Sequence, residues 1–201
     1  MSRRVAEIRL ATPADGAQLS AIYAPLVRDT AITFEVDPPD AAEMSRRVAE
    51  SLPAFPWLVA EAGDEVLGYV YASKHRERAA YLWSVDTTVY VHARVRRGGV
   101  GRALYTTLFG ILTLQRFCNA YAGISLPNPG SVGLHEAVGF EKVGVYRAVA
   151  YKLGAWHDAG WWERVIQPRP SSPQPPADIA TVRGTSGWEA AFAAGSSLLR
   201  V

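Results

Sequence analysis

The chain has 201 residues, of which 49% are hydrophobic and 20% charged, and its formal net charge is +2. Such a composition excludes a disordered protein and is typical of a globular chain long enough to bury a core. The small net charge does not favour a nucleic-acid partner, and we expect none. Cys118 is the only cysteine, so no intrachain disulfide can form. Because no signal-peptide core or bilayer-length apolar run is present, we expect a cytoplasmic protein without a membrane partner.

The first part of the chain carries signals for strands and amphipathic helices. Apolar residues recur at helical spacing over 19–27, and Asp40 is suited to cap a second helix that ends near Leu52. A Gly63-Asp64 turn indicates a β-hairpin. Strands are predicted at 8–10, 57–61 and 66–71.

In the second part, helices separate the strands. A long β-branched and aromatic run, 81–91, predicts a strand that enters a glycine-rich loop. Further strands are predicted at 120–124, 143–151 and 161–166, and helices at 101–115 and after Pro127–Ser131, ending near Gly139. This order predicts an α/β fold with a mixed sheet.

The composition changes at Pro168. Five prolines and two serines between 168 and 176 predict an extended linker. Residues 185–199 fit either a short helix or a frayed tail. We therefore expect one domain over 1–167, followed by a proline-rich linker and tail over 168–201.

The loop after the long strand is rich in glycine and arginine. Gly98, Gly99 and Gly101 remove side chains where a ligand could approach the backbone, at the start of a helix. Bare amides at a helix N-terminus, flanked by arginines, favour an anion such as phosphate. The alternative is a flexible turn with solvated arginines.

This loop fits neither of two well-known phosphate motifs. Arg102-Ala103 replaces the Lys-Ser/Thr of a Walker loop, and Leu104 replaces the third glycine of a dinucleotide fingerprint. The spacing Arg96-x-x-Gly99-x-Gly101 instead resembles the loop of the GCN5-related N-acetyltransferase (GNAT) superfamily, whose backbone amides hold the pyrophosphate of coenzyme A.

Two further positions carry titratable groups. Asn128, Ser131 and His135 are spaced to share one helix face, and a histidine there could serve as a general base. The alternative is an ordinary, partly buried helix histidine. Asp86 stands within the long strand, where a carboxylate is costly unless it is functional or held by neighbouring hydroxyls such as Thr87.

Over about residues 7–167 the chain resembles the phosphinothricin/methionine sulfoximine N-acetyltransferases of this superfamily. The resemblance rests on several blocks in matching order. They are Ile8-Arg9-Leu10-Ala11 with Asp15, Thr33-Phe34-Glu35, Pro56–Glu61, Tyr81-x-Trp83–Val91, Leu104-Tyr105, Pro127-Asn128-x-x-Ser131–Phe140 and Tyr151-Lys152-x-Gly154-x-Trp156-His157-Asp158.

The resemblance implies a GNAT fold, with a splayed central strand near Val89–Val91 and flanking helices. It also implies direct attack by an amine on acetyl-CoA, without an acyl-enzyme or a metal, and a homodimer. A base must deprotonate the ammonium, and backbone amides of the splayed strand could hold the oxyanion.

Site residues follow from the same resemblance. His135 and Asp86 match positions proposed for base catalysis. Phe34, Arg76, Arg78 and Tyr81 lie in blocks that resemble the substrate pocket, with an arginine suited to a carboxylate. Cofactor binding is implied for Val89, Val91, Arg96, Arg97, Gly98, Gly99, Val100, Gly101, Arg102, Asn128 and Ser131.

One departure concerns the base. The family commonly has Glu where this chain has Asp86, and one methylene fewer draws the carboxylate back by roughly 1.5 Å. We therefore rank His135 slightly above Asp86. The expected function is N-acetylation of a small amino acid-like amine of the phosphinothricin or methionine sulfoximine type. The alternatives are a different small amine and a non-catalytic CoA-binding domain.

Overall fold

The computed structural model describes residues 6–200. Its body is one sheet of seven strands, in the order β1-β2-β3-β4-β5-β7-β6. Neighbouring strands are antiparallel except β4 and β5, which run parallel, so the predicted mixed sheet is confirmed. The strands are β1 (Ala6–Leu10), β2 (Trp57–Ala62), β3 (Glu65–Lys74), β4 (Ser84–Val91), β5 (Asn119–Leu126), β6 (Glu141–Lys152) and β7 (Ala155–Val165).

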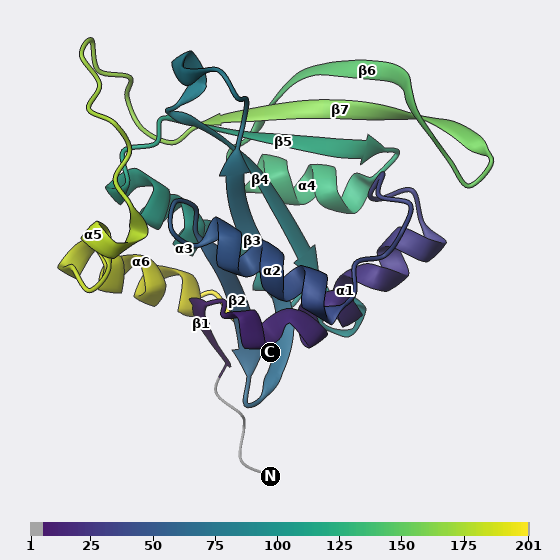
Figure 1. The fold of residues 1–201 in the computed structure, drawn as a ribbon, viewed down its shortest axis with the longest axis horizontal. Coiled ribbons are helices and arrows are strands. Elements are labelled where there is room, and N and C mark those ends of the chain that lie inside the picture. The colour runs from purple at the N-terminus through teal and green to yellow at the C-terminus, as the bar shows by residue number, and fades with distance from the viewer. Residues whose placement is uncertain (1–5, 201) are drawn as a thin grey trace.

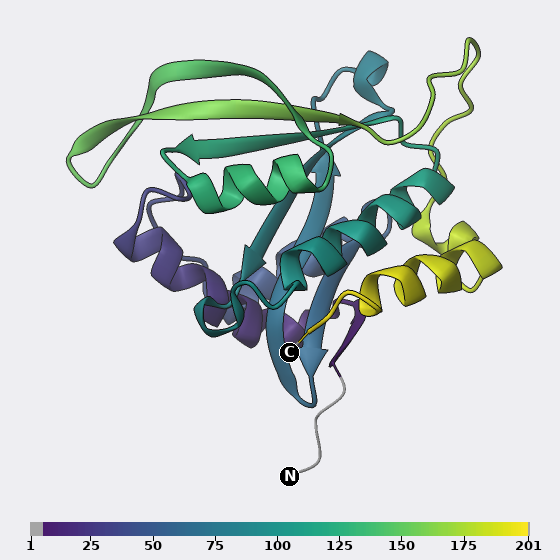
Figure 2. The ribbon, with the colours of Figure 1, turned by 180° about the vertical axis from the view of Figure 1, so that it is seen from behind.

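Helices cover both faces of the sheet (Figures 1 and 2). α1 (Gly16–Asp29) and α2 (Ala41–Ser51) bury one core against β2 and β3. α3 (Val100–Leu114) buries a second core on the opposite face. The remaining helices are α4 (Pro129–Ala137), α5 (Ile179–Val182) and α6 (Ser186–Ser196), and the short 3-10 turns are η1 (Pro13–Asp15), η2 (Ala79–Tyr81) and η3 (Ala93–Val95).

The sheet splits between β4 and β5. The two strands pair only from Ser84 to Asp86 on β4, opposite Asn119 to Tyr121 on β5. Beyond Asp86 they diverge (Figure 1), while β4 stays paired with β3 as far as Val91. The β5-facing backbone edge of residues 87–91 therefore lacks a strand partner, and the expected splayed central strand is confirmed.

Successive side chains of β4 point to opposite faces of the sheet. Val89 and Val91 pack with the α3 core, whereas Tyr90 packs with the α1 core. Asp86 is four residues before Tyr90 on the same strand, so its side chain points to the same face and its carboxylate lies on the α1 side. This alternation separates the two candidate bases, because His135 lies on the α3 side, as described below.

Two strand boundaries differ from the prediction. β4 begins at Ser84 rather than Tyr81, because residues 78–82 close a 3-10 turn through the Arg78 and Ala79 carbonyls. β7 begins at Ala155 rather than Trp161, because it pairs with β6 across a tight turn in which Gly154 has a φ of +79°. The sequence pattern therefore located the C-terminal ends of these strands but not their first residues.

The C-terminal segment forms a helix that packs on the body. The Thr185 hydroxyl caps α6 by accepting the Trp188 amide at 3.2 Å, and the Trp188 side chain is buried. Small residues bring α6 close to α3, since a Cβ on Gly110 would lie 2.6 Å from that of Ala191. Of the two alternatives for 185–199, the structure therefore shows the helix, which runs alongside α3 (Figure 2).

Candidate active site

The glycine-rich loop turns from β4 into α3 by way of two left-handed residues. Arg97 has a φ of +68°, and Gly99, the residue that precedes the helix, has a φ of +79°. A glycine is the natural residue at this second position, since L side chains are strained there. The loop thus presents the unpaired first-turn amides of α3 to the space beside β4.

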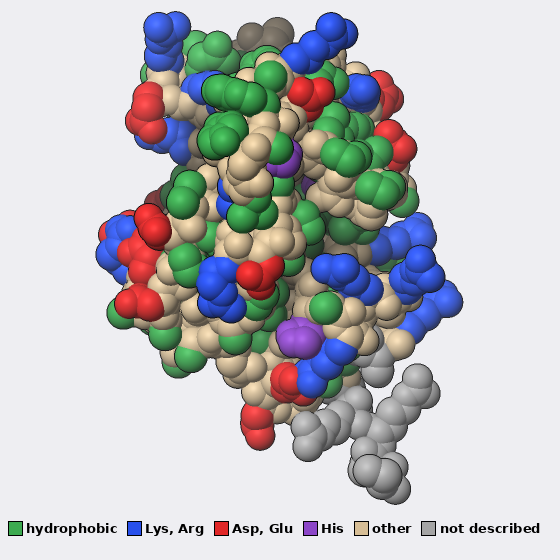
Figure 3. Space-filling view, turned by 90° about the vertical axis from the view of Figure 1, so that its right-hand side faces the viewer, with side chains coloured by type: hydrophobic (Ala, Val, Ile, Leu, Met, Phe, Trp, Pro, Cys, Tyr) green, Lys and Arg blue, Asp and Glu red, His purple; other side chains and the backbone are tan. Residues whose placement is uncertain are grey.

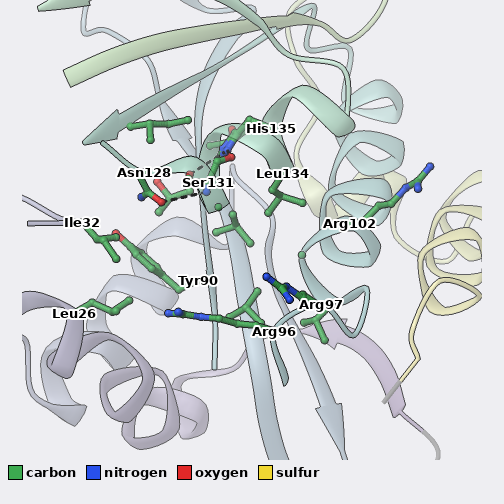
Figure 4. A pocket seen from close by; sticks show the side chains of 18 of the residues that line it. Leu26, Ile32, Tyr90, Arg96, Arg97, Arg102, Asn128, Ser131, Leu134 and His135 are labelled. Carbon is green, nitrogen blue, oxygen red and sulfur yellow. Dashed lines mark hydrogen bonds between the residues drawn. The ribbon is translucent and has the colours of Figure 1, made fainter. Parts of the chain in front are cut away.

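A cavity of about 660 Å³ lies along the split between β4 and β5. Its wall includes the diverging part of β4, the glycine-rich loop, Gly123 and Ile124 on β5, and the first turns of α4. Leu26 and Ile32 line the end on the α1 side (Figure 4). The cavity therefore crosses the sheet from the α3 side to the α1 side.

Most of the predicted cofactor residues line this cavity. Gly98 is not part of the wall, and in Figure 4 the Arg102 side chain points away from the other labelled residues. In Figure 4 the Arg97 side chain lies in the space beside the start of α3, whereas the Arg96 side chain extends toward Leu26. The predicted residues in the wall are Val89, Val91, Arg96, Arg97, Gly99, Val100, Gly101, Arg102, Asn128 and Ser131.

His135 also reaches the cavity wall, but both of its ring nitrogens are engaged. Nδ1 lies 2.7 Å from the Ser131 carbonyl oxygen, which can only accept, so Nδ1 carries the proton. Nε2 therefore accepts a hydrogen bond from the Tyr105 hydroxyl, 2.8 Å away. Burial lowers the pKa of His135, which favours the neutral form of the ring.

Asp86 lies on the other face, at the point where the strands separate. One carboxylate oxygen is 2.6 Å from Nδ1 of His75, and the other is 3.9 Å from the Arg76 guanidinium. Burial raises the pKa of Asp86, and the His75 hydrogen bond opposes this shift. A raised carboxylate pKa beside a partner group is typical of catalytic sites.

The predicted substrate residues fall into two groups. Arg76 lies beside Asp86 and stacks over Trp161 at 5.6 Å, and Tyr81 meets the ring of His75, the partner of Asp86, edge-on at 5.8 Å. Phe34 is elsewhere, with its ring centre 6.4 Å from that of His157. Arg78 is exposed ahead of η2, and none of the four is in the cavity wall.

Three features of the site were missed by sequence reasoning. His75 was given no role, because the preceding strand was predicted to end at Tyr71, whereas β3 extends to Lys74 and places His75 directly after it. Tyr105 was noted only in the Leu104-Tyr105 block of the family resemblance, with no role assigned to it. No sequence signal placed the C-terminus near the loop, where the Arg200 amide donates to the Gly98 carbonyl at 3.1 Å.

Within residues 6–200, no group of three or more His, Cys, Asp or Glu side chains is placed to hold a metal ion. In the same part of the chain, no helix combines the length and apolar character needed to cross a membrane.

The split sheet and the glycine-rich loop at the start of α3 define the class of acetyl-CoA-dependent acyltransferases. The profile of the acetyltransferase (GNAT) domain family matches residues 8–161. The chain belongs to this family.

Known proteins resemble the chain over nearly its whole length. It is 41% identical to the phosphinothricin N-acetyltransferase of Streptomyces viridochromogenes, over 90% of this chain and 98% of that protein. It is 32% identical to an L-methionine sulfoximine/L-methionine sulfone acetyltransferase of Pseudomonas paraeruginosa, over 84% of this chain and 99% of that protein. A crystal structure of a phosphinothricin acetyltransferase from Sinorhizobium meliloti in complex with AcCoA superposes with a TM-score of 0.78 at 32% identity, covering 87% and 98% of the two chains.

Proposed function

We propose that this protein transfers the acetyl group of acetyl-CoA to the amine of a small amino acid of the phosphinothricin, methionine sulfoximine or methionine sulfone type. The observation that carries the proposal is the cavity that crosses the split sheet. Through this cavity a cofactor and an acceptor can reach the same part of β4 from opposite faces of the sheet. The relatives named above act on acceptors of this type, which supports the choice.

In this proposal the cofactor enters on the α3 side. The first-turn amides of α3, with Arg96 and Arg97, hold the pyrophosphate. The β5-facing backbone of residues 87–91, which β5 leaves unpaired, holds the pantetheine arm and the thioester oxygen. Asn128 and Ser131 line the cavity at the start of α4. The Asn128 side chain caps this helix by accepting a hydrogen bond from the Ser131 amide at 3.2 Å.

The acceptor enters on the α1 side, where Asp86 lies. An ammonium has no lone pair, so a proton must leave before the nitrogen attacks the thioester carbon. We assign this step to the Asp86 side, because both nitrogens of His135 already have partners. His135 then holds the Tyr105 hydroxyl beside the cavity. Arg76, next to Asp86, is suited to the acceptor's carboxylate.

A turnover assay tests the proposed function. Purified protein is mixed with acetyl-CoA and a panel of amines, and thiol release is followed. We expect turnover with phosphinothricin, methionine sulfoximine or methionine sulfone, and little with a polyamine. Tight CoA binding without turnover on any member of the panel would instead identify a non-catalytic CoA-binding domain.

Replacing Arg96 with alanine is expected to weaken acetyl-CoA binding by about 10- to 100-fold, because a hydrogen bond to a charged group is worth about 1.5–3 kcal/mol. Isothermal calorimetry measures the change. Arg94→Ala is the matched control, since Arg94 pairs with Glu65 and is not in the cavity wall. Equal effects of the two substitutions would contradict the assignment of the loop.

We further propose a homodimer that buries the β6–β7 hairpin. Large apolar side chains are exposed along this hairpin, and hydrophobic side chains are visible on the upper part of the face in Figure 3. An exposed apolar surface of this kind is typical of a protein interface. The exposed residues are Val143, Tyr146, Val149, Tyr151, Leu153 and Trp156. A cytoplasmic location also remains a prediction.

Trp156→Glu is expected to shift the dimer toward monomer, because it places a charge where Trp156 is 65% exposed beside Tyr151. Size-exclusion chromatography with light scattering measures the mass. Arg183→Glu, on the exposed end of α5, serves as the charge control. A wild-type monomer, or a variant that remains dimeric, would contradict this interface.

A further inference from the structure

His75 lies against Asp86 in a geometry that the assigned roles do not use. Nδ1 of His75 is 2.6 Å from the Asp86 carboxylate. The ring stacks on Tyr121 with centroids 4.3 Å apart and meets Tyr81 edge-on. The two aromatic rings and the carboxylate therefore fix the imidazole in one orientation, and its side chain is only 11% exposed.

The hydrogen bond to Asp86 also fixes the tautomer. A carboxylate accepts hydrogen bonds, so Nδ1 of a neutral His75 carries the proton and Nε2 keeps its lone pair. Within residues 6–200, Nε2 of His75 has no hydrogen-bond partner, and it is not among the buried polar atoms that lack one. This lone pair is therefore open to a ligand or to solvent.

From these contacts we infer that His75 is a catalytic residue of the proposed acetyl transfer: its Nε2 removes the acceptor's proton, and Asp86 is the positioning residue that orients the ring and stabilises the imidazolium. The inference rests on the proposed function.

The proton balance is simple. An N–H bond of the substrate ammonium breaks, and the proton moves to Nε2 of His75. The freed amine lone pair forms the bond to the thioester carbon, and collapse of the tetrahedral intermediate breaks the C–S bond. The CoA thiolate takes the second nitrogen proton, and His75 returns the first to solvent. No oxidant or other co-reactant is needed.

Several charged and aromatic groups surround the His75–Asp86 pair. Arg76 approaches Asp86 from the same loop, and Lys74 pairs with Glu77 beside it. Tyr121 faces the ring from β5, where its strand partner on β7 is Glu163. Tyr81 faces the ring from η2.

The decisive variant is His75→Asn. The Asn amide stands where Nδ1 was and can still donate to Asp86, but it has no basic nitrogen. We expect kcat to fall by about 100-fold or more, with unchanged acetyl-CoA affinity, because general-base catalysis contributes about 10²–10⁴. Free imidazole is expected to restore part of the rate in His75→Gly. His92→Asn is the matched control, since Asn can keep the cap that His92 provides for the Arg94 amide.

If His75→Asn keeps a rate close to that of the wild type, His75 is not the base and the inference fails, while the proposed function stands. If the wild type acetylates no amine, the proposed function fails, and nitrogen NMR of the His75 ring tests the dyad separately. Protonated Nδ1 and a free Nε2, altered in Asp86→Asn, are the expected signals. Protonated Nε2 in the wild type would overturn the inference.

Discussion

Asp86→Asn is expected to lower kcat by about 10²- to 10⁴-fold, because the variant lacks the carboxylate that supports removal of the acceptor's proton. Acetyl-CoA affinity should change little, since Asp86 is not in the cavity wall. Steady-state kinetics and calorimetry measure the two effects. Asp64→Asn, which removes a carboxylate in the β2–β3 turn, is the control.

In the wild type, the rate should fall as the pH drops through a pKa above that of an ordinary carboxyl. Burial raises the pKa of Asp86, and the proposed mechanism requires its ionised form.

His135→Ala provides the contrast. The buried Tyr105 hydroxyl would lose its 2.8 Å acceptor and keep only the 3.4 Å contact with the Thr87 hydroxyl, which costs about 1–3 kcal/mol of stability. We therefore expect a lower melting temperature and a smaller loss of kcat than in Asp86→Asn. The reverse pattern, with turnover lost in His135→Ala and kept in Asp86→Asn, would return the role of base to His135.

The loop and helix to which we assign cofactor binding were largely predictable from sequence. A β-branched strand, three close glycines and a helical stripe are local signals, and the chain folds them next to one another. The splay was expected only from the family resemblance. No local pattern shows that β4 and β5 pair for three residues and then part, because that depends on strands 35 residues apart in the sequence.

The acceptor side of the site was harder to predict, because it too depends on residues that are far apart in the sequence. Asp86 was identified because a carboxylate inside a strand is unusual. Its partner His75 comes from the end of β3, and only the antiparallel pairing of β3 with β4 brings the two together. His135 was ranked above Asp86 because an aspartate reaches less far than a glutamate, and sequence reasoning could not reveal that Ser131 and Tyr105 occupy both ring nitrogens of His135.

The C-terminal helix lies outside both parts of the site, yet the residues that follow it contact the glycine-rich loop. After α6, a Cβ on Gly99 would lie 2.4 Å from the Leu198 carbonyl oxygen, and the Arg200 amide binds the Gly98 carbonyl. The position of α6 depends on Gly195, where a Cβ would lie 1.9 Å from the Thr107 hydroxyl and 2.7 Å from the Ala103 carbonyl. The threonine can rotate, but the backbone carbonyl of α3 cannot move alone.

Gly195→Ala is therefore expected to destabilise the protein, although the same change inside an exposed helix stabilises it by about 1 kcal/mol. Overpacking costs about 1–3 kcal/mol, which lowers the melting temperature of a domain of this size by about 2–12 °C. Gly133→Ala on α4 is the matched control, since nothing lies within 4 Å of its Cβ position. It should raise the melting temperature slightly. Acetyl-CoA binding should weaken in Gly195→Ala alone, because a shifted α6 carries Leu198 and Arg200 away from the loop. Equal stability and affinity in the two variants would show that the helix does not brace the cofactor site.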